Sequence, residues 1–220
     1  MGNSFVCGKM ALIIGGTSGI GLCVAQILSE KGAVVHVTGT HDPQCNGLHV
    51  VPCNFERNGL AELEQESMQH LLSECDILCV CYGPFVQKKM HETLMEDWKK
   101  MALLDYALPG IAVSMVLPSM MKKKCGSIVL FGGTRSELPR ACATNAAYLG
   151  AKTGLSVIAR SVAREYGSMG IRCNVILPGF TGNAPQGFLS EPMQIAEKAV
   201  YVIEQRDVNG VFLNVDYGWM

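Results

Sequence analysis

The chain has 220 residues, of which 49% are hydrophobic and 17% are charged, and its formal net charge is −1. This length predicts a single domain spanning residues 1–220 with a substantial core. The near-neutral charge provides no attraction for nucleic acid or for an anionic membrane surface, so we expect neither as a partner.

The first expected element is an apolar strand that ends in a glycine-rich turn. Residues 10–14 are typical of a buried strand, and a helical pattern over 20–28 follows directly. Between them, Gly15, Gly19 and Gly21 leave room for phosphates to approach the backbone and for the helix to approach the sheet. Strand, glycine turn and helix N-terminus together predict a site for the pyrophosphate of a dinucleotide.

Six further apolar runs predict the remaining strands of a parallel sheet. They are expected at 33–38, 48–53, 76–81, 126–131, 171–177 and 211–215. The amphipathic helices between them indicate a doubly wound α/β domain of the Rossmann type with seven parallel strands. In the helix expected after the third strand, Leu60, Leu63 and Leu71 should face inward and Glu62 should face solvent.

Tyr148 and Lys152 lie four residues apart on the helix expected after the fifth strand, so both can reach one site. A phenol with a pKa of about 10 is a poor acid at neutral pH, and an adjacent ammonium lowers that pKa. The pair therefore predicts Tyr148 as a general acid with Lys152 beside it. The alternative is that the two residues have no catalytic role and are a half-buried tyrosine next to a solvated lysine. A lysine four residues after a tyrosine is by itself common in protein sequences.

Together, Gly15-x-x-x-Gly19-x-Gly21 and Tyr148-x-x-x-Lys152 resemble the motifs of the short-chain dehydrogenase/reductase family. The resemblance covers nearly the whole chain. It implies hydride transfer between a nicotinamide dinucleotide and a carbonyl or alcohol substrate. A dinucleotide-binding sensor or interaction protein without turnover remains the alternative.

The resemblance also identifies two departures from the family's catalytic residues. Gly133 stands where the family carries a serine, which favours the sensor alternative, although Thr134 or Ser136 could supply a substitute hydroxyl. Asp105 stands where the family carries an asparagine that acts through its main-chain carbonyl. The expected catalytic residues are therefore Tyr148, Lys152, Asp105 and Thr134.

Pro109 lies four residues after Asp105 and has no N–H to donate to the Asp105 carbonyl. This predicts a helix kink from Asp105 to Pro109. With the carbonyl freed, the Asp side chain is expected to matter less than the main chain, and one water should link the carbonyl to Lys152.

The second strand leads into Gly39, Thr40 and His41, none of which is acidic. An acidic residue there would bind the two ribose hydroxyls and select NAD, so NADP(H) is favoured over NAD(H). The resemblance further implies that Asn54 accepts a hydrogen bond from the adenine amine. The expected cofactor-binding residues are Gly15, Thr17, Ser18, Gly19, Ile20, Gly21, Thr40, Asn54, Gly83, Lys152, Pro178, Gly179 and Thr181.

Ten cysteines lie mostly within apolar runs without a metal-ligand pattern, and no signal peptide is recognisable, which predicts a cytoplasmic protein without a metal site. The resemblance implies a homodimer or homotetramer, with Met101, Leu104, Ile111 and Met115 continuing the apolar interface. A short, mobile loop over 180–190 predicts an open site for a bulky small-molecule or carrier-bound carbonyl substrate.

Overall fold

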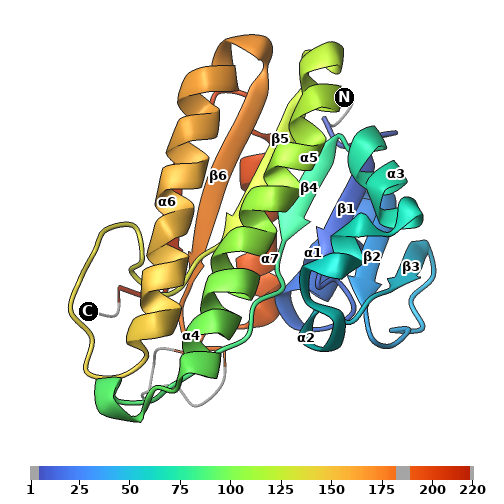
Figure 1. The fold of residues 1–220 in the computed structure, drawn as a ribbon. Helices are drawn as coiled ribbons and strands as arrows, with labels where there is room; N and C mark the ends of the chain where they lie inside the picture. The colour runs from blue at the N-terminus through green and yellow to red at the C-terminus, as the bar shows by residue number, and fades with distance from the viewer. Residues whose placement is uncertain (1–4, 182–188, 219–220) are drawn as a thin grey trace.

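The computed structural model describes residues 5–181 and 189–218. Seven strands form one parallel sheet in the order β3-β2-β1-β4-β5-β6-β7 (Figure 1). The strands are β1 (Met10–Ile14), β2 (Val34–Gly39), β3 (Leu48–Pro52), β4 (Ile77–Val80), β5 (Gly126–Phe131), β6 (Ile171–Pro178) and β7 (Phe212–Val215). These strands confirm the predicted doubly wound α/β fold.

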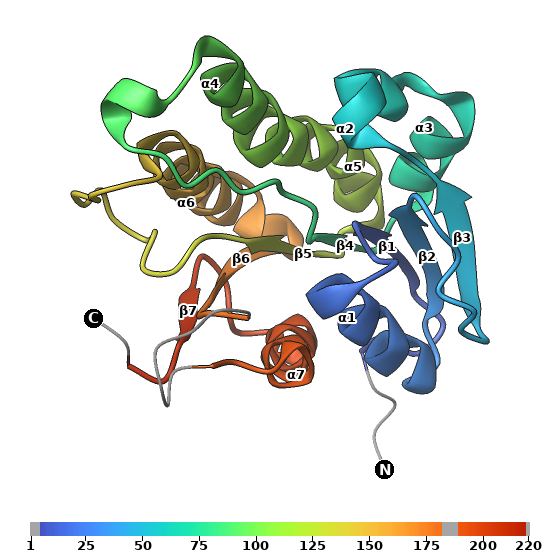
Figure 2. The ribbon, with the colours of Figure 1, turned by 90° about the horizontal axis from the view of Figure 1, so that it is seen from below.

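Helices cover both faces of the sheet (Figure 2). Helices α1 and α7 lie on one face and contact each other, whereas α3, α5 and α6 lie on the other face. The α-helices are α1 (Gly19–Glu30), α2 (Phe55–Asn58), α3 (Glu66–Glu74), α4 (Met95–Met101), α5 (Leu108–Lys123), α6 (Ala146–Tyr166) and α7 (Pro192–Glu204). Shorter helical turns are η1 (Gly59–Glu64), η2 (Met90–Glu92), η3 (Ala102–Ala107) and η4 (Gly167–Met169).

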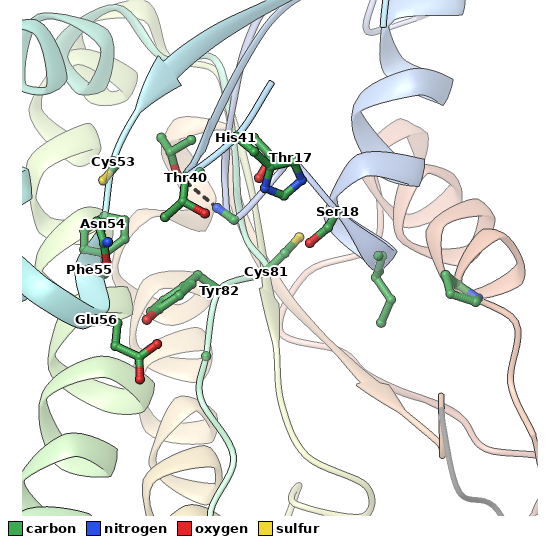
Figure 3. Close-up of a pocket in the computed structure, with 18 of the residues that line it drawn as sticks. Thr17, Ser18, Thr40, His41, Cys53, Asn54, Phe55, Glu56, Cys81 and Tyr82 are labelled. Atoms are coloured by element: carbon green, nitrogen blue, oxygen red, sulfur yellow. Dashed lines mark hydrogen bonds between the residues drawn. The ribbon is translucent and has the colours of Figure 1, made fainter. Parts of the chain in front are cut away.

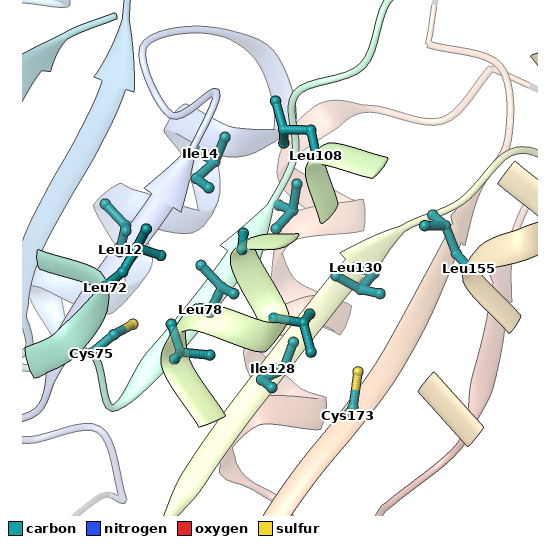
Figure 4. Packing of buried hydrophobic residues seen from close by; sticks show 14 of the residues in the cluster. Leu12, Ile14, Leu72, Cys75, Leu78, Leu108, Ile128, Leu130, Leu155 and Cys173 are labelled. Carbon is teal, nitrogen blue, oxygen red and sulfur yellow. The ribbon is translucent and has the colours of Figure 1, made fainter. Parts of the chain in front are cut away.

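The central strand β1 supplies side chains to both hydrophobic layers. Leu12 and Ile14 join the cluster beneath α3, α5 and α6 (Figure 4), and Ala11 and Ile13 join the cluster beneath α1 and α7. All four are fully buried. This alternation follows the two-residue period of a strand, and burial on both faces explains why the run is apolar throughout.

Helices α4, η3 and α5 form one continuous helix, Met95–Lys123, which by length and composition alone could cross a membrane. In the fold it packs on the sheet, where Leu108 and Val116 are fully buried. Its central turn, η3, is π-helical. A distortion was predicted at this position, and the backbone departs from an α-helix by forming a π turn before Pro109. Pro109 has no N–H and cannot donate an α-helical hydrogen bond to the Asp105 carbonyl.

The single helix predicted after β3 is divided into α2, η1 and α3, and Glu62 is buried rather than solvated. Its carboxylate accepts hydrogen bonds from the backbone N–H of Asn54 (2.8 Å), Asn58 Nδ2 (2.7 Å) and Gln65 Nε2 (2.5 Å). Burial raises the pKa of Glu62, but these donors together outweigh burial and hold its pKa below the ordinary value. Glu62 thus fixes the chain where it leaves β3.

We expect Glu62→Gln to lower the free energy of unfolding by about 1–3 kcal/mol at neutral pH, because an amide replaces a carboxylate that accepts three hydrogen bonds. The pKa of Glu62 is depressed in the folded state. Its stabilisation is therefore present above the unfolded-state value of 4.5 and is lost as pH falls through the folded-state pKa. Urea denaturation at several pH values measures both effects, with the exposed Glu64→Gln as control. Equal stability of the two variants at neutral pH would contradict this prediction.

Candidate active site

Two adjoining cavities open at the carboxyl ends of the strands, where the strand order reverses between β1 and β4. The first has a volume of about 510 Å³ and is bordered by the turn after β1, the end of β2 and residues 53–56 (Figure 3). The second, of about 860 Å³, is bordered by the β5–α6 loop, α6 and the end of β6. Ile20, Cys81, Gly83 and Thr181 line both cavities, which therefore form one continuous trough.

The trough brings together all residues expected to bind the cofactor. Those lining the first cavity are Gly15, Thr17, Ser18, Gly19, Ile20, Gly21, Thr40, Asn54, Gly83 and Thr181. Those lining the second are Lys152, Pro178 and Gly179, together with Ile20, Gly83 and Thr181 again. The loop expected to be mobile falls largely on residues 182–188, which lie outside the described residues.

The turn after β1 is tightly packed against its neighbours at Gly15 and Gly21 and open at Gly19. Gly15 has a φ of +79°, and a Cβ at Gly21 would overlap the Gly15 carbonyl oxygen. The Gly15 N–H donates to Thr38 Oγ1 at 3.0 Å, which ties the turn to β2. A Cβ at Gly19 would meet no atom within 4 Å, so this residue borders open space at the N-terminus of α1.

The other end of the first cavity is polar and has one carboxylate among its lining residues. A Cβ at Gly39 would overlap the Thr17 side chain, so no side chain fits at the end of β2. The carboxylate belongs to Glu56, which pairs with Lys100 at 2.5 Å, and this contact lowers the pKa of Glu56. Asn54 lines the same cavity, but its Oδ1 accepts the N–H of Arg57 at 3.0 Å and caps α2.

Helix α6 places Tyr148 and Lys152 on the wall of the second cavity. The Lys152 Nζ lies 5.9 Å from the centroid of the Tyr148 ring and donates to the carbonyl of Phe131 at 3.0 Å. The edge of the Phe85 ring packs against Tyr148, with the ring centroids 4.8 Å apart. Both side chains line the cavity, and Lys152 is buried whereas Tyr148 is partly exposed.

Asp105 does not line the cavity but lies behind it, fully buried, with Oδ1 3.0 Å from Lys152 Nζ. The side chain thus contacts Lys152 directly, a contact that was not predicted from sequence, and the greater importance of the main-chain carbonyl stays a prediction. The link through one water from that carbonyl to Lys152 stays a prediction. Burial raises the pKa of Asp105, and the Lys152 ammonium acts against this rise.

The electrostatic setting of Tyr148 also differs from the expectation. Burial raises the pKa of its phenol, and the Asp105 carboxylate raises it further. From sequence alone, only the Lys152 ammonium was considered, and it was predicted to lower the pKa of the phenol. Because Lys152 is paired with Asp105, the opposite charges of the pair partly cancel at the phenol.

Gly133 faces Tyr148 at the position where the resemblance predicted a missing serine. A Cβ there would lie 3.0 Å from Tyr148 Cε1 and 3.4 Å from its hydroxyl oxygen. Thr134 lines the cavity, but its hydroxyl donates to the Pro178 carbonyl at 2.7 Å, which ties the loop to β6. Ser136 is buried, and its Oγ accepts the N–H of Gly133 at 3.0 Å.

Several residues of the second cavity were not found from sequence, namely Phe85, Gln87, Arg140, Cys142 and Asn145. They lie on irregular segments that lack periodicity. Arg140 stabilises its segment by donating to the carbonyl oxygens of Thr134 (3.0 Å) and Arg135 (3.2 Å). Among the described residues, no group of three or more His, Cys, Asp or Glu side chains could hold a metal ion.

Comparison with known proteins identifies the family of the chain. Residues 9–192 match the model of the short chain dehydrogenase family. The chain is 29% identical over 241 residues to 3-oxoacyl-(acyl-carrier-protein) reductase FabG of Vibrio harveyi, covering 96% of this chain and 97% of the relative. It is 25% identical over 250 residues to 2,5-dichloro-2,5-cyclohexadiene-1,4-diol dehydrogenase LinX of Sphingobium indicum, covering 97% of each chain.

A solved structure of a short chain dehydrogenase/reductase family protein superimposes with a TM-score of 0.84 at 24% identity, covering 97% of both chains. This likeness supports the fold, and the match over residues 9–192 supports the family. The chain belongs to the short-chain dehydrogenase family of oxidoreductases.

Proposed function

We propose that the chain is an NADP(H)-dependent oxidoreductase that reduces a carbonyl substrate, with Tyr148 as the general acid. The observation that carries this proposal is the continuity of the trough. Its first cavity contains the glycine turn for a dinucleotide, and its second contains the Tyr148 phenol. A cofactor extended along the trough would bring its nicotinamide to the wall that holds Tyr148.

When bound, the reduced nicotinamide supplies a hydride to the carbonyl carbon of the substrate. Tyr148 donates its phenolic proton to the carbonyl oxygen as that oxygen gains negative charge, which yields the alcohol and a phenolate. The phenolate then takes up a proton from solvent. Lys152 would hold the cofactor and stabilise the phenolate. The Asp105 main-chain carbonyl would pass protons from solvent through one water to Lys152, and Thr134 is the candidate second hydroxyl.

The preference for NADP(H) rests on the end of β2. An acidic residue that would repel a 2′-phosphate has no room at Gly39, and the next two residues are Thr40 and His41. The hydroxyls of Thr17 and Ser18 line the same cavity and can donate to a phosphate.

The substrate would be a carbonyl compound, free or bound to a carrier, that fills the second cavity. The reductase relative is named for a carrier-bound substrate and the dehydrogenase relative for a cyclic diol, so membership of the family does not select between these classes. Phe85 offers an aromatic edge next to Tyr148, and Arg140 offers a cationic group.

A sensor without turnover is the second candidate function. The observation that favours it is Gly133, because the site lacks the family's usual serine beside Tyr148.

We also propose a homodimer or homotetramer located in the cytoplasm. Met101 and Leu104 are buried within the subunit, which corrects their predicted place on the interface. A groove of about 440 Å³ between α5 and α6 remains, with exposed Ile111 and Val157 on its walls. All ten cysteines are free thiols, which suits a reducing compartment.

We expect calorimetry to show tighter binding of NADPH than of NADH, and Gly19→Val to abolish binding of both. A valine side chain at Gly19 would enter the space next to the start of α1, where phosphates are expected. Gly8→Val is a matched control, because Gly8 also has a positive φ and open space but lies outside the trough. Unchanged binding by the Gly19 variant would contradict the site, and a preference for NADH would contradict the cofactor assignment.

We expect Tyr148→Phe to lower kcat by about 10²–10⁴-fold with a panel of carbonyl substrates, because the proton donor is lost. The dissociation constant for NADPH should change little. Tyr201→Phe, on the exposed face of α7, serves as the control. Binding of NADPH with no turnover by the wild-type chain across the panel would favour the sensor, and full activity of the Tyr148 variant would exclude Tyr148 as the acid.

We expect Gly133→Ser to have a kcat about tenfold above that of Gly133→Ala, since its hydroxyl would lie next to Tyr148 and donate to the carbonyl oxygen. The alanine variant is the matched control, because both variants place a Cβ 3.0 Å from Tyr148 Cε1. Steady-state kinetics with NADPH measure the difference. Equal rates for the two variants would show that this position contributes no hydrogen bond to the reaction.

A further inference from the structure

An ion pair between Asp105 and Lys152 is buried behind the phenol of Tyr148. The two side chains are 0% and 6% exposed, and Oδ1 and Nζ are 3.0 Å apart. The pair joins the π turn η3 to helix α6, and Lys152 also donates to the Phe131 carbonyl. Two charges removed from water in this way interact more strongly than a surface pair.

Gly83 shows how closely the surrounding chain fits this pair. A Cβ at Gly83 would overlap Asp105 Oδ1 and lie 2.7 Å from Lys152 Nζ. Gly83 also lines both cavities, so the pair lies directly beneath the wall of the trough. The carboxylate thus lies behind the wall of the trough and acts on the phenol through space and through Lys152.

We propose that Asp105 is a positioning residue: its carboxylate is the counter-ion of Lys152, offsets the ammonium charge felt by Tyr148, and keeps the phenol protonated. This inference rests on the proposed role of Tyr148 as a proton donor. An unpaired ammonium would favour the phenolate. With the paired carboxylate present, Tyr148 stays a proton donor to higher pH. Donation to the substrate remains favourable, because the alkoxide formed by hydride transfer is a stronger base than a phenolate.

The other ionisable groups around the pair do not replace Asp105 in this role. Lys100 of α4 also acts on Asp105, but it is paired with Glu56 of α2. Burial raises the pKa of Tyr82 to about 12 and raises that of the Cys81 thiol, so both groups after β4 are neutral at physiological pH. On α6 the charged partner is Lys152 itself.

The test is an ultraviolet titration of phenolate in the protein without cofactor, which is independent of turnover. The difference between the wild-type chain and Tyr148→Phe isolates the ionisation of Tyr148. In the wild-type chain we expect no Tyr148 step at or below the ordinary tyrosine pKa of about 10. For the Asp105→Asn variant, the Tyr148 step is the difference between Asp105→Asn and the double variant Asp105→Asn/Tyr148→Phe. This step should lie at a pH about 1–3 units lower than in the wild-type chain. Asp105→Ser removes the same charge and should show the same shift, which provides a second variant if the first does not fold.

Asp76→Asn is the matched control, because Asp76 pairs with Lys123 at 3.1 Å and lies just before β4, at the amino ends of the strands, whereas the trough opens at their carboxyl ends. It should leave the Tyr148 step unchanged. A wild-type step at or below pH 10, or a folded Asp105 variant with no shift, would overturn the inference. In the enzyme, the alkaline limb of kcat/KM for reduction should move down by the same amount. If the phenolate shift occurs but no variant turns over, the inference stands and the proposed function fails.

Discussion

The buried ion pair between Asp105 and Lys152 is the constraint around which the active-site half of the molecule is arranged. An ammonium as buried as Lys152 needs partners, and the structure supplies the Asp105 carboxylate and the Phe131 carbonyl at the end of β5. The pair in turn requires a residue without a side chain at Gly83. Elements that are far apart in sequence are thereby fixed against one another at the trough.

The shape of the first cavity, where the cofactor is proposed to bind, depends on close steric contacts instead of charge. The backbone of the turn after β1 approaches α1 so closely that a Cβ at Gly21 would overlap the Gly15 carbonyl, and one at Gly39 would overlap Thr17. These contacts leave the N-terminus of α1 accessible and remove any acidic side chain from the end of β2. A dinucleotide would therefore meet backbone and hydroxyl groups in this part of the trough.

The sequence allowed correct prediction of the strands, because runs such as Met10–Ile14 are buried on both faces and carry a strong apolar signal. The Tyr148 and Lys152 juxtaposition was also predictable, since helical periodicity sets it. The burial of Glu62 was not, because its three donors are recruited by breaks in the helix that periodicity does not reveal. The contact between the Asp105 side chain and Lys152 was not predictable either, because it depends on a π turn and on packing between distant elements.

The two departures from the family pattern act on the same phenol by different physical routes. Gly133 carries no hydroxyl next to Tyr148, whereas the resemblance predicts a serine at this position. Asp105 adds a charge, which opposes ionisation of the phenol. A phenol that is hard to ionise is a weaker acid, yet in the proposed reduction the alkoxide that it would protonate is a stronger base than a phenolate. Gly133 also places no side chain against the Tyr148 ring, where a Cβ would lie 3.0 Å from Cε1, so the same departure that removes a hydroxyl leaves the phenol uncovered on this side.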